Sequence, residues 1–277
     1  MATDDTPVRT LSRREAELVG WLEAERRPSV SSVEVRERLG WSDVVTRNVL
    51  SRLAEKGWIR RTARGRYETV LAQTGGWSPP NPWAALSTWE QRYYVGFQSA
   101  AYEHGLTPDR PGSVQACVAT GAKRPRAWKD VPIVLIFFQR FEVAGVEIGE
   151  LHGFRVRLAS VERVLVDGAT RPGRMGSVLG LARVVERALD RIDWQEVVSL
   201  GNKFSRGNVG LRRIAALLEV LGHEVPEVLA AAATARPGKS AFFLAEREIH
   251  GTHGERLPQW QVILNVDPSV IREEVRR

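Results

Sequence analysis

The first 70 residues carry hydrophobic positions at helical and then at strand spacing. Apolar side chains recur with a helical period in three short stretches, at residues 12–25, 31–40 and 42–57. Each stretch opens on a serine, which favours the first position of a helix, and the last two end at a glycine. Two short strands joined by a turn at residues 61–65 follow. Three helices and a hairpin in this order predict a winged helix-turn-helix.

A change in composition separates this unit from the rest of the chain. Residues 72–83 read AQTGGWSPPNPW, and their glycines and prolines cannot continue a helix or a central strand. We therefore predict a winged helix-turn-helix domain over residues 1–76, a linker over 77–86 and a second domain over 87–277.

The second domain alternates strand patterns with helical ones. Strands rich in β-branched and aromatic residues are predicted at 114–120, 131–141, 143–148, 154–158, 242–246 and 261–266. Helices are predicted at 87–104, from Ser160 onward, and at 177–189, 194–200, 209–221 and 225–233. A small sheet covered by segregated helices predicts the α+β class for this larger domain.

Composition and charge narrow the choice of partners. Lys and Arg total 40 against 33 for Asp and Glu, a net charge of +7, which favours a polyanionic partner such as nucleic acid. The single cysteine, Cys117, rules out an internal disulfide framework and a Cys-rich zinc site. The longest apolar run, Val131 to Phe138, is too short to cross a bilayer, and the start lacks the apolar core of a signal peptide. We expect a cytoplasmic protein with no membrane segment.

The third predicted helix is the element expected to read DNA, because a major groove admits one helix and displays a sequence-specific pattern of base edges. The residues opposite its apolar stripe and near its start are the candidates for base contacts, with Arg47 preferred. They are Ser42, Asp43, Thr46, Arg47 and Asn48.

The residues that follow, six cations and one serine, suit phosphates or a minor groove. They lie on the end of the helix and on the hairpin, with no acidic residue between positions 56 and 66: Ser51, Arg52, Lys56, Arg60, Arg61, Arg64 and Arg66. The alternative is a winged helix that contacts protein, with a basic surface that is merely solvated.

Two further basic sets either extend the DNA footprint or only solvate a face. The first is Lys123, Arg124, Arg126 and Lys129, and the second is Lys203, Arg206, Arg212 and Arg213.

Residues 156–174 read VRLASVERVLVDGATRPGR, a strand followed by a helix with Glu-Arg-x-Leu-x-Asp and then Arg-Pro. This pattern resembles the AbiEi family, the antitoxins of type IV toxin–antitoxin (abortive infection) systems. The similarity extends to residues 99–108, to 193–222 and to the last predicted strand, ending at Asn265. The matching motif residues are Glu162, Arg163, Leu165, Asp167, Arg171 and Pro172.

The resemblance implies that the winged helix represses the toxin–antitoxin operon and that the second domain counteracts a nucleotidyltransferase-like toxin encoded beside it. The residues by themselves do not indicate antitoxin action. Since Arg163 and Asp167 are four positions apart, they can pair on one helix face, and we favour a structural role for them and Glu162 over direct toxin contact.

Signals for enzyme chemistry are weak. Residues 235–240, ARPGKS, are similar to the end of a phosphate-binding loop but lack its leading glycine and its strand-then-helix context. The five histidines are scattered. We therefore expect no enzymatic activity, no cofactor and no metal site.

Two alternatives stay open. One is a stand-alone transcription regulator whose second domain senses a small ligand in an apolar pocket with converging polar groups. The other is a nucleic-acid-processing enzyme that uses carboxylates and a divalent ion. For a DNA-binding protein, one winged helix offers few base contacts, so we expect an inverted repeat filled by a dimer or by two cooperating monomers.

Overall fold

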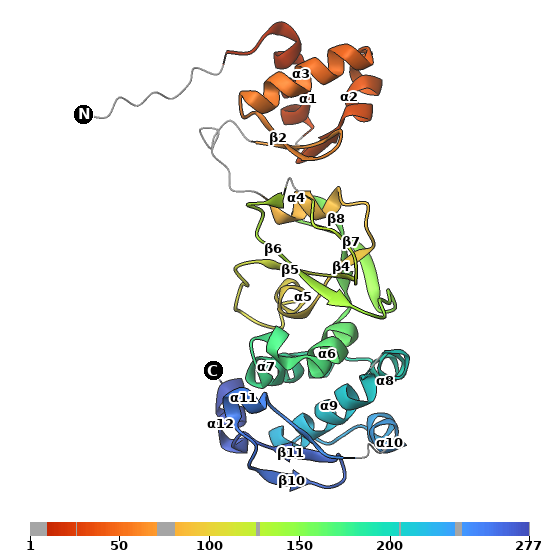
Figure 1. Cartoon of the computed structure of the whole chain (residues 1–277), viewed down its shortest axis with the longest axis vertical. Helices are drawn as coiled ribbons and strands as arrows, with labels where there is room; N and C mark the ends of the chain where they lie inside the picture. Colours follow the sequence, from red (N-terminus) through yellow and green to blue (C-terminus); the bar gives the residue numbers. More distant parts are fainter. Residues whose placement is uncertain are drawn as a thin grey trace, which may run out of the picture. The chain divides into compact units, whose positions relative to one another are not determined.

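The computed structural model describes residues 10–25, 27–70, 81–125, 128–204, 206–235 and 240–276 (Figure 1). The chain divides into two compact units. Unit 1 comprises residues 1–91, 123–133 and 149–156, and unit 2 comprises residues 92–122, 134–148 and 157–277. Unit 1 therefore runs past the linker predicted at 77–86 and takes in two later segments. Within the described ranges, no helix is both long and apolar enough to span a bilayer.

The N-terminal part of unit 1 has the order of elements that the hydrophobic pattern predicts. The elements are α1 (Arg13–Ala24), β1 (Ser29–Ser31), α2 (Ser32–Leu39), α3 (Asp43–Glu55), β2 (Ile59–Ala63) and β3 (Arg66–Thr69). β2 and β3 form the predicted hairpin, and β1, which was not predicted, pairs with β3 through Val30 and Tyr67 in an antiparallel sheet of order β1-β3-β2. A strand of three residues is too short for its alternation to stand out in the sequence.

Local signals set the helix ends in this part. Ser12 N donates to Glu15 Oε2 at 2.6 Å at the start of α1, and Ser31 and Glu34 form a reciprocal capping box at the start of α2. Gly40, with φ of +65°, ends α2 in the left-handed region that favours glycine. The helices bury a continuous apolar face against the hairpin, and its fully buried members include Leu18, Leu22, Leu50, Leu53 and Ile59.

The later part of the chain contains two small sheets and their covering helices, which confirms the predicted α+β class. The strands of the larger sheet are β4 (Tyr93–Val95), β5 (Val114–Ala119), β6 (Ile133–Phe138), β7 (Val146–Leu151) and β8 (Phe154–Ala159), in the order β6-β5-β4-β8-β7. The C-terminal sheet has the order β10-β11-β9, from β9 (Phe242–Phe243), β10 (Glu255–Leu257) and β11 (Val262–Leu264).

Most helices of unit 2 pack against α9 (Gly207–Leu221), whose buried residues include Leu211, Ile214 and Leu218 (Figure 1). A side chain at Gly207 would collide with the carbonyl oxygen of Gly201, so glycine is required where α8 (Trp194–Lys203) and α9 meet. The remaining helices are α4 (Pro82–Ser87, in unit 1), α5 (Phe97–Glu103), α6 (Val161–Thr170), η3 (Pro172–Met175), α7 (Val178–Ala188), η4 (Leu189–Arg191), α8 (Trp194–Lys203), α10 (Glu227–Ala235), α11 (Arg247–His250) and α12 (Pro268–Arg276).

The prediction of one helix over residues 87–104 is wrong. This stretch contains the end of α4, the strand β4 and then α5. Tyr93, Tyr94 and Val95 are all buried, because β4 lies in the middle of the sheet between β5 and β8. A strand buried on both faces has no alternation of polar and apolar residues to distinguish it from part of a helix.

Glu68 in β3 makes the stability of unit 1 depend on pH. Its carboxylate is 5% exposed and lies 3.5 Å from the guanidinium of Arg60. Burial raises the pKa of Glu68 from an ordinary 4.5 to about 7, and Arg60 opposes the rise only in part. Between these values the folded chain holds a proton that the unfolded chain has released, so stability falls as pH rises through this window.

We expect Glu68→Gln to remove this dependence. Relative to the variant, the parent chain should lose up to about 3 kcal/mol between pH 4.5 and 7, at about 1.4 kcal/mol per pKa unit. Thermal melts of both proteins from pH 4 to 8 measure the difference. Glu37→Gln, at an exposed position of α2, is the control. Parallel melting curves for the parent and Glu68→Gln over this range would contradict the expectation.

Candidate functional site

A groove of about 860 Å³ lies between α3 and the β2–β3 hairpin, within unit 1. We call it the α3–hairpin groove. Three arginines and one carboxylate line it, so its wall carries a positive charge. Among its lining residues are Asp43, Arg47, Ser51, Arg61, Arg64 and Tyr67.

Arg47 is an accessible member of the residues predicted to contact bases. Its side chain is 73% exposed, and its Nη2 lies 2.7 Å from Oδ2 of Asp43, one helical turn earlier. Asp43 also lies 3.4 Å from Arg36. Asn48 is exposed on the same helix. Because an exposed ion pair contributes little free energy, Arg47 can leave Asp43 for another partner at small cost.

Two other residues predicted to contact bases have local roles in α3. Thr46 is 1% exposed and its hydroxyl donates to the carbonyl of Ser42 at 3.0 Å, so its prediction is wrong. The reason is helical geometry, since Thr46 lies three and four residues before the buried Val49 and Leu50 and shares their face. Ser42 is exposed, but its Oγ caps the helix by accepting from Val45 N at 3.4 Å.

Lys56 and Arg60, predicted to contact phosphates, have carboxylate partners within unit 1. Lys56 Nζ lies 2.7 Å from Glu15 Oε2 and 2.9 Å from the carbonyl of Thr10, and it thereby ties the end of α3 to α1. Arg60 pairs across the hairpin with Glu68. Both cations therefore have a structural role, while their side chains stay about one third exposed, at 35% and 32%, and their contact with phosphates stays a prediction.

The remaining basic residues of the predicted surface are exposed. Ser51, also exposed, donates to Glu55 at 3.1 Å. Arg61 lies where the pairing register of the hairpin shifts, and its Nε donates to the carbonyl of Ala63 at 3.3 Å. The exposed arginines are Arg52, Arg61, Arg64 and Arg66.

A backbone contact fixes the hairpin turn beside α2. Gly65 has φ of +68°, and its carbonyl accepts from Ser32 N at 2.7 Å. An added Cβ at Gly65 would lie 2.8 Å from the Ser32 hydroxyl, so a side chain there would also push the turn away. Ser32 was not predicted as part of this surface. Gly65 in the turn was the sequence signal for this contact, because a glycine allows another backbone to come close.

The structure gives Arg124 of the first further basic set, and Arg212 and Arg213 of the second, structural roles, while Lys203 and Arg206 of the second set are exposed. Arg124 donates to the carbonyls of Trp128, Val131 and Ile133 at 2.6–2.7 Å and so holds its own loop. Arg126 lies outside the described residues, while Lys123 and Lys129 are exposed. Arg212 and Arg213 are 3% and 8% exposed and donate to backbone carbonyls, so they do not extend a DNA-binding surface.

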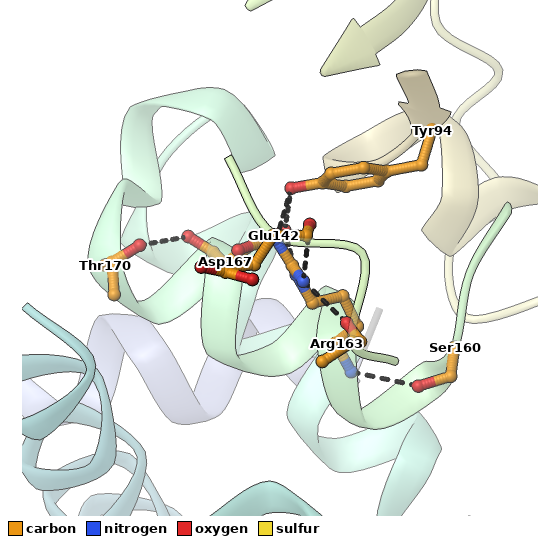
Figure 2. A network of polar contacts seen from close by, with 7 residues as sticks. Tyr94, Glu142, Ser160, Arg163, Asp167 and Thr170 are labelled. Atoms are coloured by element: carbon orange, nitrogen blue, oxygen red, sulfur yellow. Dashed lines mark hydrogen bonds and ion pairs between the residues drawn. The ribbon is translucent and has the colours of Figure 1, made fainter. Parts of the chain in front are cut away.

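The motif residues Arg163 and Asp167 form a buried ion pair in unit 2. Arg163 Nε lies 2.8 Å from Asp167 Oδ2, and the residues are 2% and 3% exposed. The Tyr94 hydroxyl donates to Asp167 at 2.7 Å and accepts from Arg163 Nη2 at 2.7 Å (Figure 2). Arg163 Nη1 donates to the carbonyls of Glu142 and Ala144, at 3.3 and 2.6 Å. The network therefore joins α6, β4 and the loop before β7.

The electrostatics of this network favour the protonated states of Tyr94 and Arg163, whereas burial raises the pKa of Asp167 and Arg163 opposes that rise only in part. Burial raises the pKa of the Tyr94 hydroxyl well above its usual value, so Tyr94 remains a donor to Asp167. Burial acts to lower the pKa of Arg163, but Asp167 and Tyr94 outweigh it and the pKa rises. Arg163 thus stays charged. Tyr94 was missed because its strand was predicted to be helix.

The other motif residues lie around the same helix. Glu162 accepts from the backbone N of Asp193 at 3.2 Å, which links α6 to the start of α8. Arg171 follows α6, donates from Nη1 to the carbonyl of Phe137 at 3.2 Å and places its guanidinium 4.2 Å from the centre of the Phe138 ring. Over the described ranges, no group of three or more His, Cys, Asp and Glu side chains could hold a metal ion.

Comparison with known proteins identifies a shared fold. No family model and no curated protein matches the chain. Among solved structures, the chain is similar to the crystal structure of the RV2827C protein from Mycobacterium tuberculosis, with a TM-score of 0.65 and 18% sequence identity over 91% of this chain and 92% of that chain. Similarity at this level of identity concerns the fold and not the function.

We expect Asp167→Asn to destabilise the chain by about 3–5 kcal/mol, because it leaves the buried charge of Arg163 without its counter-ion. Tyr94→Phe should cost less, about 1–3 kcal/mol, since the ion pair remains. Chemical denaturation followed by circular dichroism measures both. Asp190→Asn, at an exposed position of η4, is the control. A change below about 1 kcal/mol for Asp167→Asn would contradict a stabilising role of the network.

Proposed function

We propose that the chain is a cytoplasmic, sequence-specific DNA-binding antitoxin that represses its own type IV toxin–antitoxin operon. The observation that carries the DNA-binding part is the α3–hairpin groove, with Arg47, Arg61 and Arg64 on its wall. The antitoxin part is supported by the resemblance of residues 156–174 to the AbiEi family.

The groove offers a division of roles between helix and hairpin. In this proposal α3 enters the major groove, and Arg47 and Asn48 contact base edges, where Arg pairs best with guanine and Asn with adenine. Arg61, Arg64 and Arg66 on the hairpin, and Arg52 at the end of α3, contact phosphates. Asp43 orients Arg47 in the free protein and either releases it to the DNA or accepts a hydrogen bond from cytosine.

The number of base contacts sets the expected architecture of the operator. One helix with two or three readers provides only a few contacts, each worth about 1–3 kcal/mol of discrimination. Useful specificity therefore requires two copies of unit 1 on an inverted repeat, as a dimer or as two monomers that bind cooperatively.

The antitoxin part of the proposal adds a protein partner to the operator DNA. The implied partner is a nucleotidyltransferase-like toxin encoded by the neighbouring gene. The motif residues Arg163 and Asp167 are buried, which favours a scaffold role for them and leaves any toxin contact to exposed surfaces. Whether neutralisation uses direct contact is part of the experiment below.

We expect Arg47→Ala and Arg64→Ala to have different effects on DNA binding. Arg47→Ala should reduce the preference for the chain's own promoter over scrambled duplex by about 1–3 kcal/mol, because it removes a base contact. Arg64→Ala should weaken binding to both duplexes equally and lower the salt slope by about one, because it removes a phosphate contact. Fluorescence anisotropy at several salt concentrations measures both quantities.

Arg14→Ala removes the same charge from an exposed position of α1 outside the groove, and it should leave both quantities unchanged. If the parent chain shows no preference for its promoter at moderate salt, the DNA-binding proposal fails. If all three variants behave alike, binding depends on net charge alone and the groove assignment is wrong.

The antitoxin part predicts that expression of the neighbouring gene alone arrests growth and that co-expression of this chain restores it. Arg47→Ala should still restore growth when both genes are driven from foreign promoters, because neutralisation does not require the operator. Colony counts with and without the chain measure the effect, and co-purification tests direct contact. A neighbouring gene that is harmless, or toxic whether or not the chain is present, would contradict the antitoxin part while leaving DNA binding intact.

A further inference from the structure

A cavity of about 530 Å³ opens beside the buried network in unit 2. We call it the arginine cavity, because Arg140, Arg163, Arg171 and Arg206 all line it. These residues come from separate places: the segment just after β6, the helix α6, the segment after α6 and the position before α9. None belongs to the α3–hairpin groove, so the cavity is not part of the proposed DNA site.

The charges around the cavity do not balance. Its wall contains one carboxylate, that of Asp167, which is already paired with Arg163 at 2.8 Å. Among the residues that the structure describes, no carboxylate lies within ion-pair distance of Arg140, Arg171 or Arg206. Asp167 also attracts Arg171, but this one carboxylate faces four guanidinium groups. The cavity wall therefore keeps an excess of positive charge, which an anion placed there would offset.

Two of the four arginines are held in place before any ligand arrives. Arg163 is fixed by its hydrogen bonds to Tyr94, Asp167 and the loop before β7, and its guanidinium lies 3.9 Å from the centre of the Phe204 ring. Arg171 is fixed between the Phe137 carbonyl and the Phe138 ring. A guanidinium that is already ordered loses little entropy on binding, and its planar set of donors matches the oxygens of a phosphate.

Arg206 occupies a backbone position that suits glycine. Its φ is +65°, in the left-handed region, where a residue with a side chain costs about 1–2 kcal/mol relative to the usual conformations. The side chain is exposed and lines the cavity. Such outliers gather at ligand sites, and here the strained residue supplies one of the unpaired cations.

Aromatic rings form the rest of the wall. Phe137, Phe138 and Phe204 line the cavity, and Phe137 is 47% exposed, which is unusual for a large apolar residue. A ring face at the rim suits a planar base, since bases of every kind stack on aromatic side chains. Inorganic phosphate alone would use the arginines but not the rings. The volume is that of a small-ligand site.

From these observations we propose that the arginine cavity binds a nucleoside phosphate, with the phosphates on Arg140, Arg171 and Arg206 and the base against Phe137. This assignment does not rest on DNA binding or on antitoxin action. It concerns a different unit and different residues, and it is tested without DNA.

The test is calorimetric titration of the full chain with ATP, GTP, CTP and UTP, alongside inorganic tripolyphosphate and the matching nucleosides. At least one nucleotide should bind with 1:1 stoichiometry, about tenfold or more tightly than tripolyphosphate and than its own nucleoside, because only the nucleotide engages both the arginines and the rings. Single-stranded oligonucleotides form a further arm, and they should bind no more tightly than the mononucleotide.

Arg206→Gly is the sharpest variant, because glycine suits φ of +65° and the substitution removes the cation without straining the backbone. It should weaken nucleotide binding about tenfold while leaving the melting temperature of the free chain unchanged or higher. Phe137→Ser should bring the affinity for the nucleotide close to that for tripolyphosphate. Two controls should bind the nucleotide as the parent does: Arg187→Gln, at an exposed position of α7, and Arg47→Ala in the α3–hairpin groove.

Three results would overturn the assignment: no nucleotide binds, Arg206→Gly binds as tightly as the parent, or tripolyphosphate binds as tightly as every nucleotide. Loss of binding in Arg47→Ala would also overturn it, because the nucleotide would then occupy the DNA groove. The first three outcomes leave the promoter-binding measurements untouched.

Discussion

The arrangement of unit 2 depends on the ion pair and the hydrogen bonds of the buried Arg163 guanidinium. Moving a charged side chain out of water costs several kcal/mol unless its hydrogen bonds and its charge are satisfied. Asp167 supplies the charge, Tyr94 bridges the pair, and the carbonyls of Glu142 and Ala144 accept the remaining contacts. Because these groups come from α6, β4 and a loop, the cost is met only when all three elements are in place. The same placement brings Arg171 and the Phe138 ring to the wall of the arginine cavity.

Local signals explain which parts of the fold were predictable. The serine caps, the glycine at the end of α2 and the hairpin turn act through neighbours a few residues away, so the N-terminal element order could be predicted from the sequence. The strand β4 could not, because Tyr93 and Tyr94 are both buried by sheet neighbours that are distant in the sequence. The buried face of α3 was predicted without Thr46, and Thr46 was therefore placed on the exposed face of the helix.

For the candidate sites, the sequence identifies a cation but not its partner. Lys56 pairs with Glu15, which lies 41 residues away, and Arg213 donates to the carbonyl of Leu244, 31 residues away. These basic residues and the exposed Arg64 look alike in the sequence, since all belong to runs of positive charge. The distinction between a structural cation and an available one depends on tertiary contacts. The arginine cavity was not predicted for the same reason, since its four arginines lie between positions 140 and 206 and converge only in the fold.

The two basic sites differ in how easily the ion pairs of their arginines can be broken when a ligand binds. In the α3–hairpin groove, Arg47 is paired with Asp43 in solvent, where the pair is weak and screened by salt, so an exchange of partners is easy and reversible. In the arginine cavity, the pair of Arg163 with Asp167 is buried, and separating it would leave a carboxylate uncompensated. Arg163 therefore stays paired with Asp167, while Arg140, Arg171 and Arg206 are the cations that can bind a ligand. A surface with exchangeable pairs suits a long polyanion read at varying salt, whereas a fixed hollow suits one small anion of defined shape.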